Sequence, residues 1–281
     1  MTIDLNLLKS PGKLSKLVQD GDFLKSADGD SYALQSGVPI LLTQEIKKYV
    51  ETFDLKYTSQ NEPWDYSRRA IEQVRHVYVA AKAKKLIGDG KRILDIGCAL
   101  GQLTHRLKNI CSEVWAIDIS PTAAVKVQKL LLEKSQWEGF KVAAASASDL
   151  PFSDQSFRVV LLSDGLVGWE FSEALQMAAL KEAYRVLEPG GYAILTDYLN
   201  PRDFEKHKNN VLKGPFQFVE SEFLGDRIGF QIANNFKKIS GLWPIKALLG
   251  SLRFNSFLCD ISKPFGPSMS KHMSIILQKP K

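Results

Sequence analysis

One short segment joins an apolar run to a turn of small residues, an arrangement suited to binding a nucleotide. The run Ile93–Ile96 leads directly into Gly97, Ala99 and Gly101. Small residues let backbone N–H groups approach a bound cofactor closely, and the residues that follow are expected to form a helix. The spacing departs from the dinucleotide fingerprint G-x-G-x-x-G, because Ala99 holds its second small position and Gln102 its third. The sequence therefore favours a nucleotide loop that does not cradle a pyrophosphate.

Carboxylates stand at this point and at the end of the next apolar run. Asp95 lies within the first run, and Asp118 ends the second run, Val114–Ile117. An acid at the tip of the second strand can accept hydrogen bonds from both hydroxyls of a ribose. Either aspartate alone could instead cap a helix or stabilise a turn. Their succession favours a nucleoside site.

The spacing Asp95-x-Gly97-x-Ala99-x-Gly101 resembles the first motif of class I S-adenosylmethionine (SAM) methyltransferases with a type 11-like core. In that family the loop wraps an amino-acid nucleoside that carries no phosphate. Ala99 stands where the family usually has glycine. Later segments follow in the family's order: residues 148–157, residues 159–164 as the fourth strand, and residues 182–191 as helix, turn and entry to the fifth strand. The resemblance covers residues 93–198 and implies SAM as the cofactor.

The resemblance also implies which residues contact that cofactor. Asp149 matches the acid that takes the adenine amino group. The segment before the first strand often covers the cofactor in this family, so Tyr66, Arg69 and Arg75 are candidates for the methionine carboxylate. Surface helix positions are the alternative, more so for Arg75. The remaining implied contacts are Asp95, Gly97, Cys98, Ala99, Gly101, Asp118, Ile119, Ser148, Leu150 and Ser163.

Methyl transfer from a sulfonium asks little of a protein beyond in-line placement and exclusion of water, so a catalytic base is optional. A base should lie at the carboxyl edge of the sheet. Asp164 and Asp197 end the fourth and fifth expected strands and are the catalytic candidates. Asp164 could instead cap the next helix. Tyr198 and His207 are weaker choices for a base. Together with Trp169 they are the candidate substrate contacts, although His207 could be a solvated surface residue.

The absence of two motifs narrows the range of possible methyl acceptors. Residues 163–166 lack the Asn/Asp-Pro-Pro-aromatic turn of enzymes that methylate exocyclic amines, and no cysteine lies near this edge as RNA cytosine C5 methylation requires. The favoured function is therefore a SAM-dependent methyltransferase acting on O, N or C of a small, partly apolar molecule. The alternatives are an RNA methyltransferase and a non-catalytic SAM-binding partner subunit.

Composition agrees with a globular enzyme. The chain has 281 residues, 44% hydrophobic content and a net charge of +6, and residues 201–281 hold 13 Lys/Arg against 6 Asp/Glu. That basic part could attract an acidic metabolite, a membrane surface or RNA, although scattered lysines on solvated faces are the commoner explanation of such an excess of positive charge. No apolar run reaches the roughly 18 residues of a membrane span. Three cysteines without metal spacing and no export signal favour the cytoplasm, and no metal site is expected.

The expected architecture is α/β, with a doubly wound Rossmann-like sheet of seven strands. Residues 1–45 form a small β-rich module that resembles the zinc-ribbon activators of certain methyltransferases, with Ser10, Lys13, Lys25 and Asp28 where zinc-binding cysteines would stand. An unrelated β-rich segment is the alternative. Residues 46–86 form a helical linker that covers the cofactor, and residues 87–281 form the SAM-binding core. The insertion 199–265 is a candidate lid, with dimerisation as its competing use.

Overall fold

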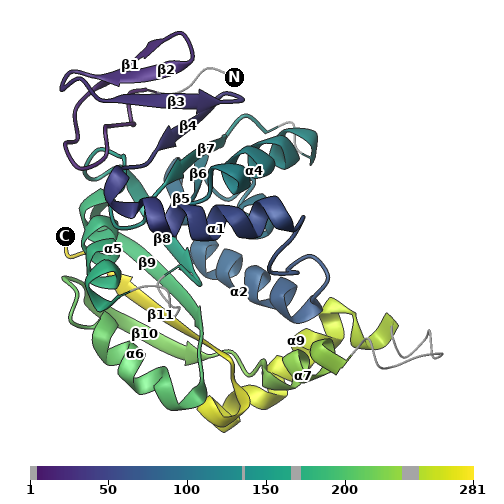
Figure 1. The fold of residues 1–281 in the computed structure, drawn as a ribbon. Helices are drawn as coiled ribbons and strands as arrows, with labels where there is room; N and C mark the ends of the chain where they lie inside the picture. Colours follow the sequence, from purple (N-terminus) through teal and green to yellow (C-terminus); the bar gives the residue numbers. More distant parts are fainter. Residues whose placement is uncertain (1–4, 135–136, 166–171, 236–246) are drawn as a thin grey trace.

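In the computed structural model, residues 5–134, 137–165, 172–235 and 247–281 are described. Figure 1 shows one continuous sheet with helices on both sides. The strands are β1 Leu17–Asp20, β2 Phe23–Ser26, β3 Ser31–Gln35, β4 Val38–Leu41, β5 Arg92–Ile96, β6 Glu113–Asp118, β7 Phe140–Ala145, β8 Phe157–Ser163, β9 Leu187–Tyr198, β10 Gln217–Phe223 and β11 His272–Gln278. The helices are η1 Gln44–Ile46, α1 Lys47–Ser59, α2 Ala70–Leu86, α3 Gln102–Arg106, α4 Pro121–Lys134, α5 Glu173–Val186, η2 Pro201–Asp203, α6 Phe204–Val211, α7 Arg227–Asn235, α9 Leu252–Ser262 and η4 Lys263–Met269.

The centre of the sheet is parallel and runs in the order β7-β6-β5-β8-β9. β11 pairs antiparallel with β9, and β10 pairs antiparallel with β11. The chain order reverses at β5, which lies between β6 and β8. Ligands of open α/β sheets bind beside such a reversal, at the carboxyl ends of the strands. The topology therefore places a site at the ends of β5 and its neighbours.

The central strands are apolar on both faces, which explains their nearly continuous hydrophobic sequences. Ile93 of β5 packs into a core cluster with residues of α2, α3 and α4, whereas its neighbour Leu94 packs into a second cluster that includes α5 and the N-terminal strands. Both leucine and isoleucine are fully buried. Successive side chains of a strand point to opposite faces, so one run of residues supplies both cores.

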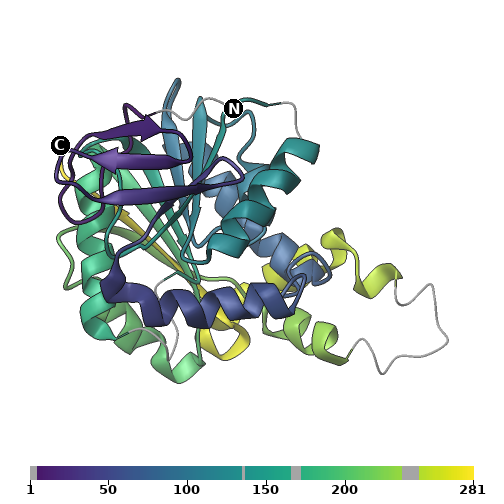
Figure 2. The same ribbon diagram turned by 45° about the horizontal axis from the view of Figure 1, so that its top comes forward.

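The expectation of seven strands is corrected, because the sheet has eleven. The strands β1 to β4 extend it beyond β7 through a parallel pairing in which Ile40 faces Ala144 and Leu41 faces Ala145. The N-terminal strands were expected as a separate module, and the sequence carries no local signal for a pairing partner so far along the chain. Figure 2 shows these strands beside the core sheet.

The insertion 199–265 contributes to the sheet as well as to its surroundings. β10 lies within it and forms one edge of the sheet against β11. The helices α6, α7 and α9 make up most of its other described residues. Within the described ranges, the helices lack the length and apolar composition needed to cross a bilayer.

The positions compared with zinc-binding cysteines are taken up by polar contacts near β1 and β2. Lys13 forms an ion pair with Asp30 at 2.8 Å, and Lys25 pairs with Asp20 at 2.5 Å. Ser10 is fully buried and its hydroxyl accepts the backbone N–H of Ser15 at 2.9 Å. These contacts join the loops of the N-terminal strands. The likeness to a zinc ribbon stays a prediction.

Candidate functional site

A cavity of about 940 Å³ lies at the carboxyl ends of the parallel strands. Its lining comes from the ends of β5, β6, β7, β8 and β9 and from α1, α5 and α6. In Figure 1, α1 lies across the front of the sheet, with one end toward α5 and the other toward α4. Asp54 of α1 fixes that position, because its carboxylate accepts the N–H of Thr122 at 2.8 Å and the hydroxyl of the same residue at 3.0 Å, in the first turn of α4. The helix thereby becomes a wall of the cavity.

The loop after β5 turns through residues with positive φ, as its small side chains predict. Gly97 has φ 74° and Ala99 has φ 50°, a conformation that costs alanine about 1 kcal/mol. The turn closes on β6: the N–H groups of Gly97 and Cys98 donate to the Ile117 carbonyl at 2.9 and 3.0 Å. This arrangement brings Gly97 and Ala99 of the turn to the cavity wall.

Asp118, at the end of β6, faces the cavity and holds the loop at the same time. Its Oδ2 accepts the N–H of Ala99 at 3.0 Å, and its Oδ1 accepts the N–H of Ser120 at 3.0 Å. Each oxygen keeps a second lone pair, so the carboxylate can also accept two ligand hydroxyls. The side chain is only 6% exposed, and this burial raises its pKa to about 6 despite the two backbone donors. The geometry suits a ribose diol.

Three of the residues predicted to contact the cofactor lie behind the loop instead of on the cavity wall. Asp95 is 1% exposed and accepts the hydroxyl of Thr104 at 2.6 Å, and burial raises its pKa to about 6. Cys98 is buried, which raises the pKa of its thiol. Gly101 precedes α3 with φ 76°, and a Cβ there would lie 2.5 Å from Cγ2 of Val127. These residues shape the loop from beneath.

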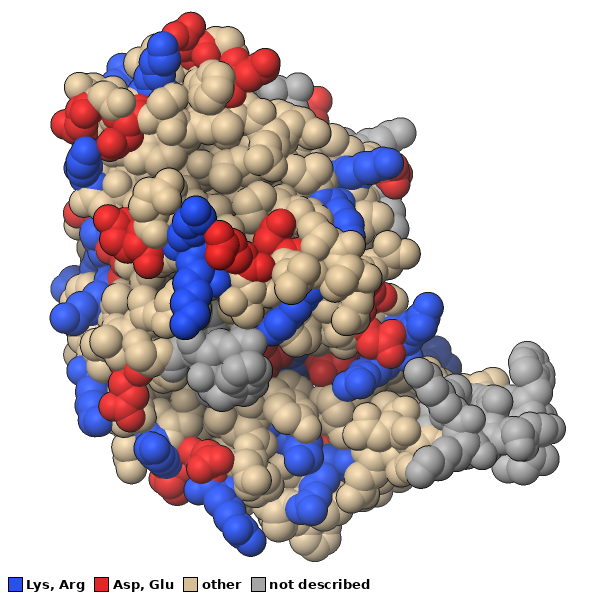
Figure 3. All heavy atoms as spheres, viewed as in Figure 1, with Lys and Arg blue, Asp and Glu red and all other residues tan. Residues whose placement is uncertain are grey.

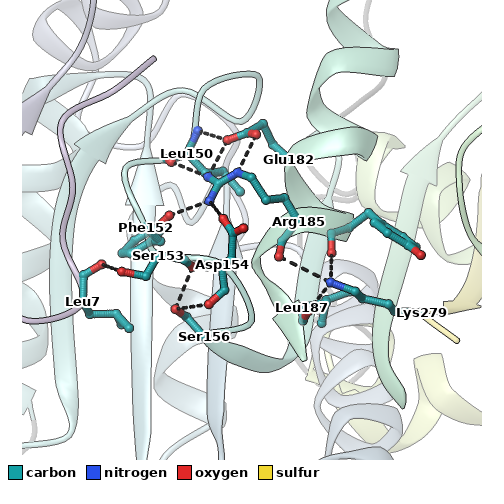
Figure 4. A network of polar contacts seen from close by, with 11 residues as sticks. Leu7, Leu150, Phe152, Ser153, Asp154, Ser156, Glu182, Arg185, Leu187 and Lys279 are labelled. Atoms are coloured by element: carbon teal, nitrogen blue, oxygen red, sulfur yellow. Dashed lines mark hydrogen bonds and ion pairs between the residues drawn. The ribbon is translucent and has the colours of Figure 1, made fainter. Parts of the chain in front are cut away.

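In the segment after β7, too, some of the predicted cofactor contacts line the cavity and others do not. Ser148 lines the cavity, whereas the carboxylate of Asp149 accepts the N–H of Gly12 at 2.6 Å and does not line it. Leu150 is fully buried in the core. Figure 4 shows why the segment lies there: Arg185 of α5 donates to the Leu150 carbonyl at 2.8 Å, and Glu182 accepts the Leu150 N–H at 2.8 Å. The structure therefore brings Ser148 to the site and directs Asp149 toward the N-terminal strands.

A buried ion cluster lies below the end of β8. Arg75 of α2 is 2% exposed and contacts Asp164 Oδ2 at 3.0 Å, Glu72 at 2.8 Å and the Ser163 hydroxyl at 3.0 Å. Asp164 also accepts the N–H of Tyr198 at 2.8 Å through Oδ1. Asp164, Ser163 and Tyr198 line the cavity, but Arg75 does not. Asp164 is thus a wall residue whose two oxygens are already engaged.

Asp197 and His207 form a second buried pair, at the end of β9. Asp197 is fully buried and does not line the cavity, whereas His207 of α6 does. His207 Nε2 lies 2.9 Å from Asp197 Oδ2. Burial lowers the pKa of His207, but the hydrogen bond and charge of Asp197 outweigh it and hold that pKa above its ordinary value. His207 is therefore not a solvated surface residue.

Most other predicted contacts line the same cavity, namely Tyr66, Arg69 and Ile119. Trp169 falls outside the described residues. Sequence reasoning did not name a further set of lining residues from η1, α1, α5, η2 and α6, which are Ile46, Tyr49, Phe53, Lys56, Tyr57, Glu173, Leu175, Gln176, Ala179, Asp203, Lys206 and Asn210. Only the assignment of residues 46–86 as a cofactor cover pointed toward α1, and nothing in the sequence indicated which face of that helix would turn inward.

Comparison with known families finds a match to the central part of the chain. A family model described as a methyltransferase domain matches residues 94–195. This match bears out the expectation of a SAM-dependent methyltransferase domain, and it includes the loop, β6, β8 and most of β9.

Curated proteins are similar to part of the chain. Demethylmenaquinone methyltransferase of Chlorobaculum parvum is 31% identical over 137 residues, which cover 47% of this chain and 52% of the relative. The ubiquinone/menaquinone biosynthesis C-methyltransferase UbiE of Coxiella burnetii is 25% identical over 162 residues, 57% of this chain and 61% of the relative. The chain thus spans between half and two thirds of the length of these relatives.

Solved structures show the same fold at low sequence identity. N-methyltransferase NodS from Bradyrhizobium japonicum, in complex with S-adenosyl-L-homocysteine, has a TM-score of 0.56 and 15% identity, and the match covers 83% of this chain and 98% of NodS. The [4+2]-cyclase SpnF has a TM-score of 0.54 and 19% identity, with 74% of this chain and 80% of that chain covered. At these identities the likeness concerns the fold alone.

Proposed function

We propose that the chain is a SAM-dependent methyltransferase that transfers a methyl group to O, N or C of a small acceptor by in-line displacement. The observation that carries the proposal is the single cavity that extends along the strand ends from Asp118 to His207. Between β6 and β9 lie three strand spacings, or roughly 14 Å. A cavity of this length has room for a nucleoside at one end and an acceptor at the other.

The residues at the β6 end fit SAM. Asp118 offers two buried oxygens for the ribose hydroxyls. Gly97, which suits the positive φ at its position, leaves that part of the wall free of a side chain. Ser148 and Ile119 line the place expected for the adenine, and Tyr66 and Arg69 line the place expected for the methionine carboxylate. When bound, SAM supplies an electrophilic methyl group. The chain's own part is to hold and align it and to exclude water.

A small, partly apolar acceptor fits the β9 end. Tyr49, Phe53, Leu175 and Phe230 contribute aromatic and aliphatic side chains to the cavity wall, beside polar ones from α6. Phe230 packs edge to face against Tyr198 at the end of β9. A cavity of this mixed type is typical of small-molecule sites. Two relatives carry quinones in their names, which agrees with an acceptor of this class. On the face drawn in Figure 3, basic side chains are interspersed with acidic ones and form no continuous basic track of the kind that binds RNA.

Asp164 and Asp197, the two carboxylates predicted to be catalytic, hold different positions in the proposed site. Asp164 lines the cavity, and each of its oxygens already has a partner, Arg75 or the N–H of Tyr198. The second lone pair of Oδ1 can accept a hydrogen bond from a hydroxyl or amine of the methyl acceptor. Asp197 has no access to the cavity except through His207. The two therefore act at different depths of the site.

The experiment that tests the proposal is a titration of the purified chain with SAM by calorimetry, followed by incubation with methyl-labelled SAM and a set of hydroquinones, phenols and amines. Saturable binding with transfer of label to one acceptor class supports it. Absence of SAM binding at millimolar concentration would overturn it.

A further inference from the structure

Burial of the pair formed by Asp197 and His207 costs desolvation free energy, which a purely structural role would not explain. Asp197 is fully buried, and among the described residues its Oδ1 has no hydrogen-bond partner. Burial raises the pKa of this carboxyl, even though His207 lowers it in part. A buried ionic pair often stabilises a fold less than apolar residues of the same volume would. A pair of this kind at the wall of a cavity is a candidate for chemistry.

The orientation of the imidazole ring leaves one nitrogen for a ligand. Nε2 faces the carboxylate of Asp197, so that nitrogen carries the proton of their hydrogen bond. Nδ1 makes no hydrogen bond to the described part of the chain, and the residue lines the cavity. A proton taken up at Nδ1 would produce an imidazolium whose charge is stabilised by Asp197.

We propose that His207 is the general base of the transfer, oriented by Asp197, and that the acceptor therefore carries a dissociable proton at or conjugated with the atom that is methylated. This inference rests on the proposed function. It selects phenols, enols and hydroquinones over amines, because the lone pair of a neutral amine can attack a methyl group without prior loss of a proton. His207 is the catalytic residue in this scheme, and Asp197 is a positioning residue.

The step balances. The acceptor's O–H proton moves to Nδ1 of His207, and the electron pair that it leaves behind forms the new bond from O, or from the conjugated C, to the methyl carbon. The bond from that carbon to sulfur breaks, and its electron pair stays on sulfur. For methylation at carbon, the ring proton is then lost to solvent, and the imidazolium returns its proton to the oxygen, which restores the hydroquinone. For methylation at oxygen, the imidazolium releases its proton to solvent.

Other charged groups surround the same part of the cavity and define the pH dependence. Asp197 approaches His207 from β9, Glu173 lines the cavity from α5, and Asp203 and Lys206 line it from η2 and α6. Among them Asp197 supplies the charge and the hydrogen bond that raise the pKa of His207. A rate limited by free His207 should therefore rise with pH through a value above that of ordinary histidine.

Three variants test the inference: His207→Gln, Asp197→Asn, and Glu205→Gln as a control on the exposed side of α6. SAM binding is measured by calorimetry, and single-turnover methylation is measured against pH with a short-chain demethylmenaquinol and, separately, a primary alkylamine. NMR follows the titration of the His207 ring in protein without ligands. We expect SAM affinity within twofold of wild type in all variants. His207→Gln should slow transfer to the hydroquinone about 100-fold or more, and Asp197→Asn should lower both the rate and the pKa of the His207 ring.

The inference is overturned if His207→Gln keeps a rate within threefold of wild type at every pH. It also fails if the ring of His207 titrates alike in wild type and Asp197→Asn, or if the amine is methylated and the hydroquinone is not. The last result leaves the proposed function intact, because SAM binding and methyl transfer would persist. If the wild-type protein does not bind SAM, both the proposed function and the inference about His207 are overturned.

Discussion

Replacement of Asp118 by Asn separates the cost of a buried charge from its use in binding. Burial raises the pKa of this carboxyl from 3.8 to about 6. Between these pH values the folded protein holds a proton that the unfolded chain has lost, so the stability contributed by this group falls as pH rises through that window. A shift of about two units corresponds to about 3 kcal/mol, fully expressed above pH 7.

Asparagine removes that charge but offers one acceptor in place of two. One of the N–H groups of Ala99 and Ser120 then loses its partner, which costs about 1 kcal/mol. We therefore expect Asp118→Asn to be about 2 kcal/mol more stable than wild type at pH 8. The advantage should be lost as pH falls from 6 toward 4, and below pH 4 the variant should be less stable by up to about 1 kcal/mol. SAM affinity should fall by about 1 to 3 kcal/mol, or roughly 5- to 150-fold, because a ribose hydroxyl loses a charged acceptor.

Urea denaturation at pH 8 and pH 4 measures the stability, and calorimetric titration with SAM measures the affinity. Asp22→Asn is the matched control, since Asp22 is exposed in the turn between β1 and β2 and its replacement should change neither quantity. An Asp118→Asn protein that binds SAM as tightly as wild type would refute the ribose assignment. A variant that is less stable than wild type at pH 8 would refute the reasoning about the buried charge.

Three further substitutions probe how the site is held. Asp54→Ala should lower the free energy of unfolding by about 1 to 3 kcal/mol and weaken SAM binding, because it releases α1 from α4; urea denaturation and calorimetry measure the two effects. Gly101→Ala should destabilise by more than Gly88→Ala in the same denaturation assay, because both glycines have φ near 70° but only Gly101 has a neighbour, at 2.5 Å from the added Cβ. Arg75→Met should cost about 3 to 5 kcal/mol of unfolding free energy, because it strands two partly or fully buried carboxylates.

Each of these has a result that contradicts it. Unchanged SAM affinity in Asp54→Ala would mean that α1 does not cover the cofactor. Equal losses in the two glycine variants would show that backbone strain alone decides them. A stable Arg75→Met protein would show that the ion cluster contributes nothing to the fold.

Much of the site follows from local sequence, and the rest depends on tertiary contacts. Gly97, Ala99 and Asp118 could be predicted because a strand, its loop and the next strand are close in sequence and repeat a family pattern. The sequence does not specify which residues of the loop face the cavity. Cys98 and Gly101 are therefore predicted as cofactor contacts, although in the structure both pack beneath the loop and do not line the cavity. A turn exposes only one of its sides to the ligand, and small residues serve both sides.

The pairing of Asp197 with His207 illustrates a different limit. Both residues were candidates separately, but their contact joins β9 to α6 across a turn whose geometry the sequence does not specify. The same holds for the strands at the N-terminal end of the sheet, because side-chain alternation predicts a strand without naming its neighbour. The expected seven strands became eleven for that reason.

The parallel contact between β4 and β7 has a consequence for the order in which the protein folds. It closes a loop of about 100 residues, which makes it slow to form and entropically costly compared with hairpins such as β1–β2. During synthesis the first forty residues leave the ribosome long before their partner strand exists, since domains emerge from the N-terminal end. Until β7 has been synthesised, the strands β1 to β4 can therefore pair only with one another.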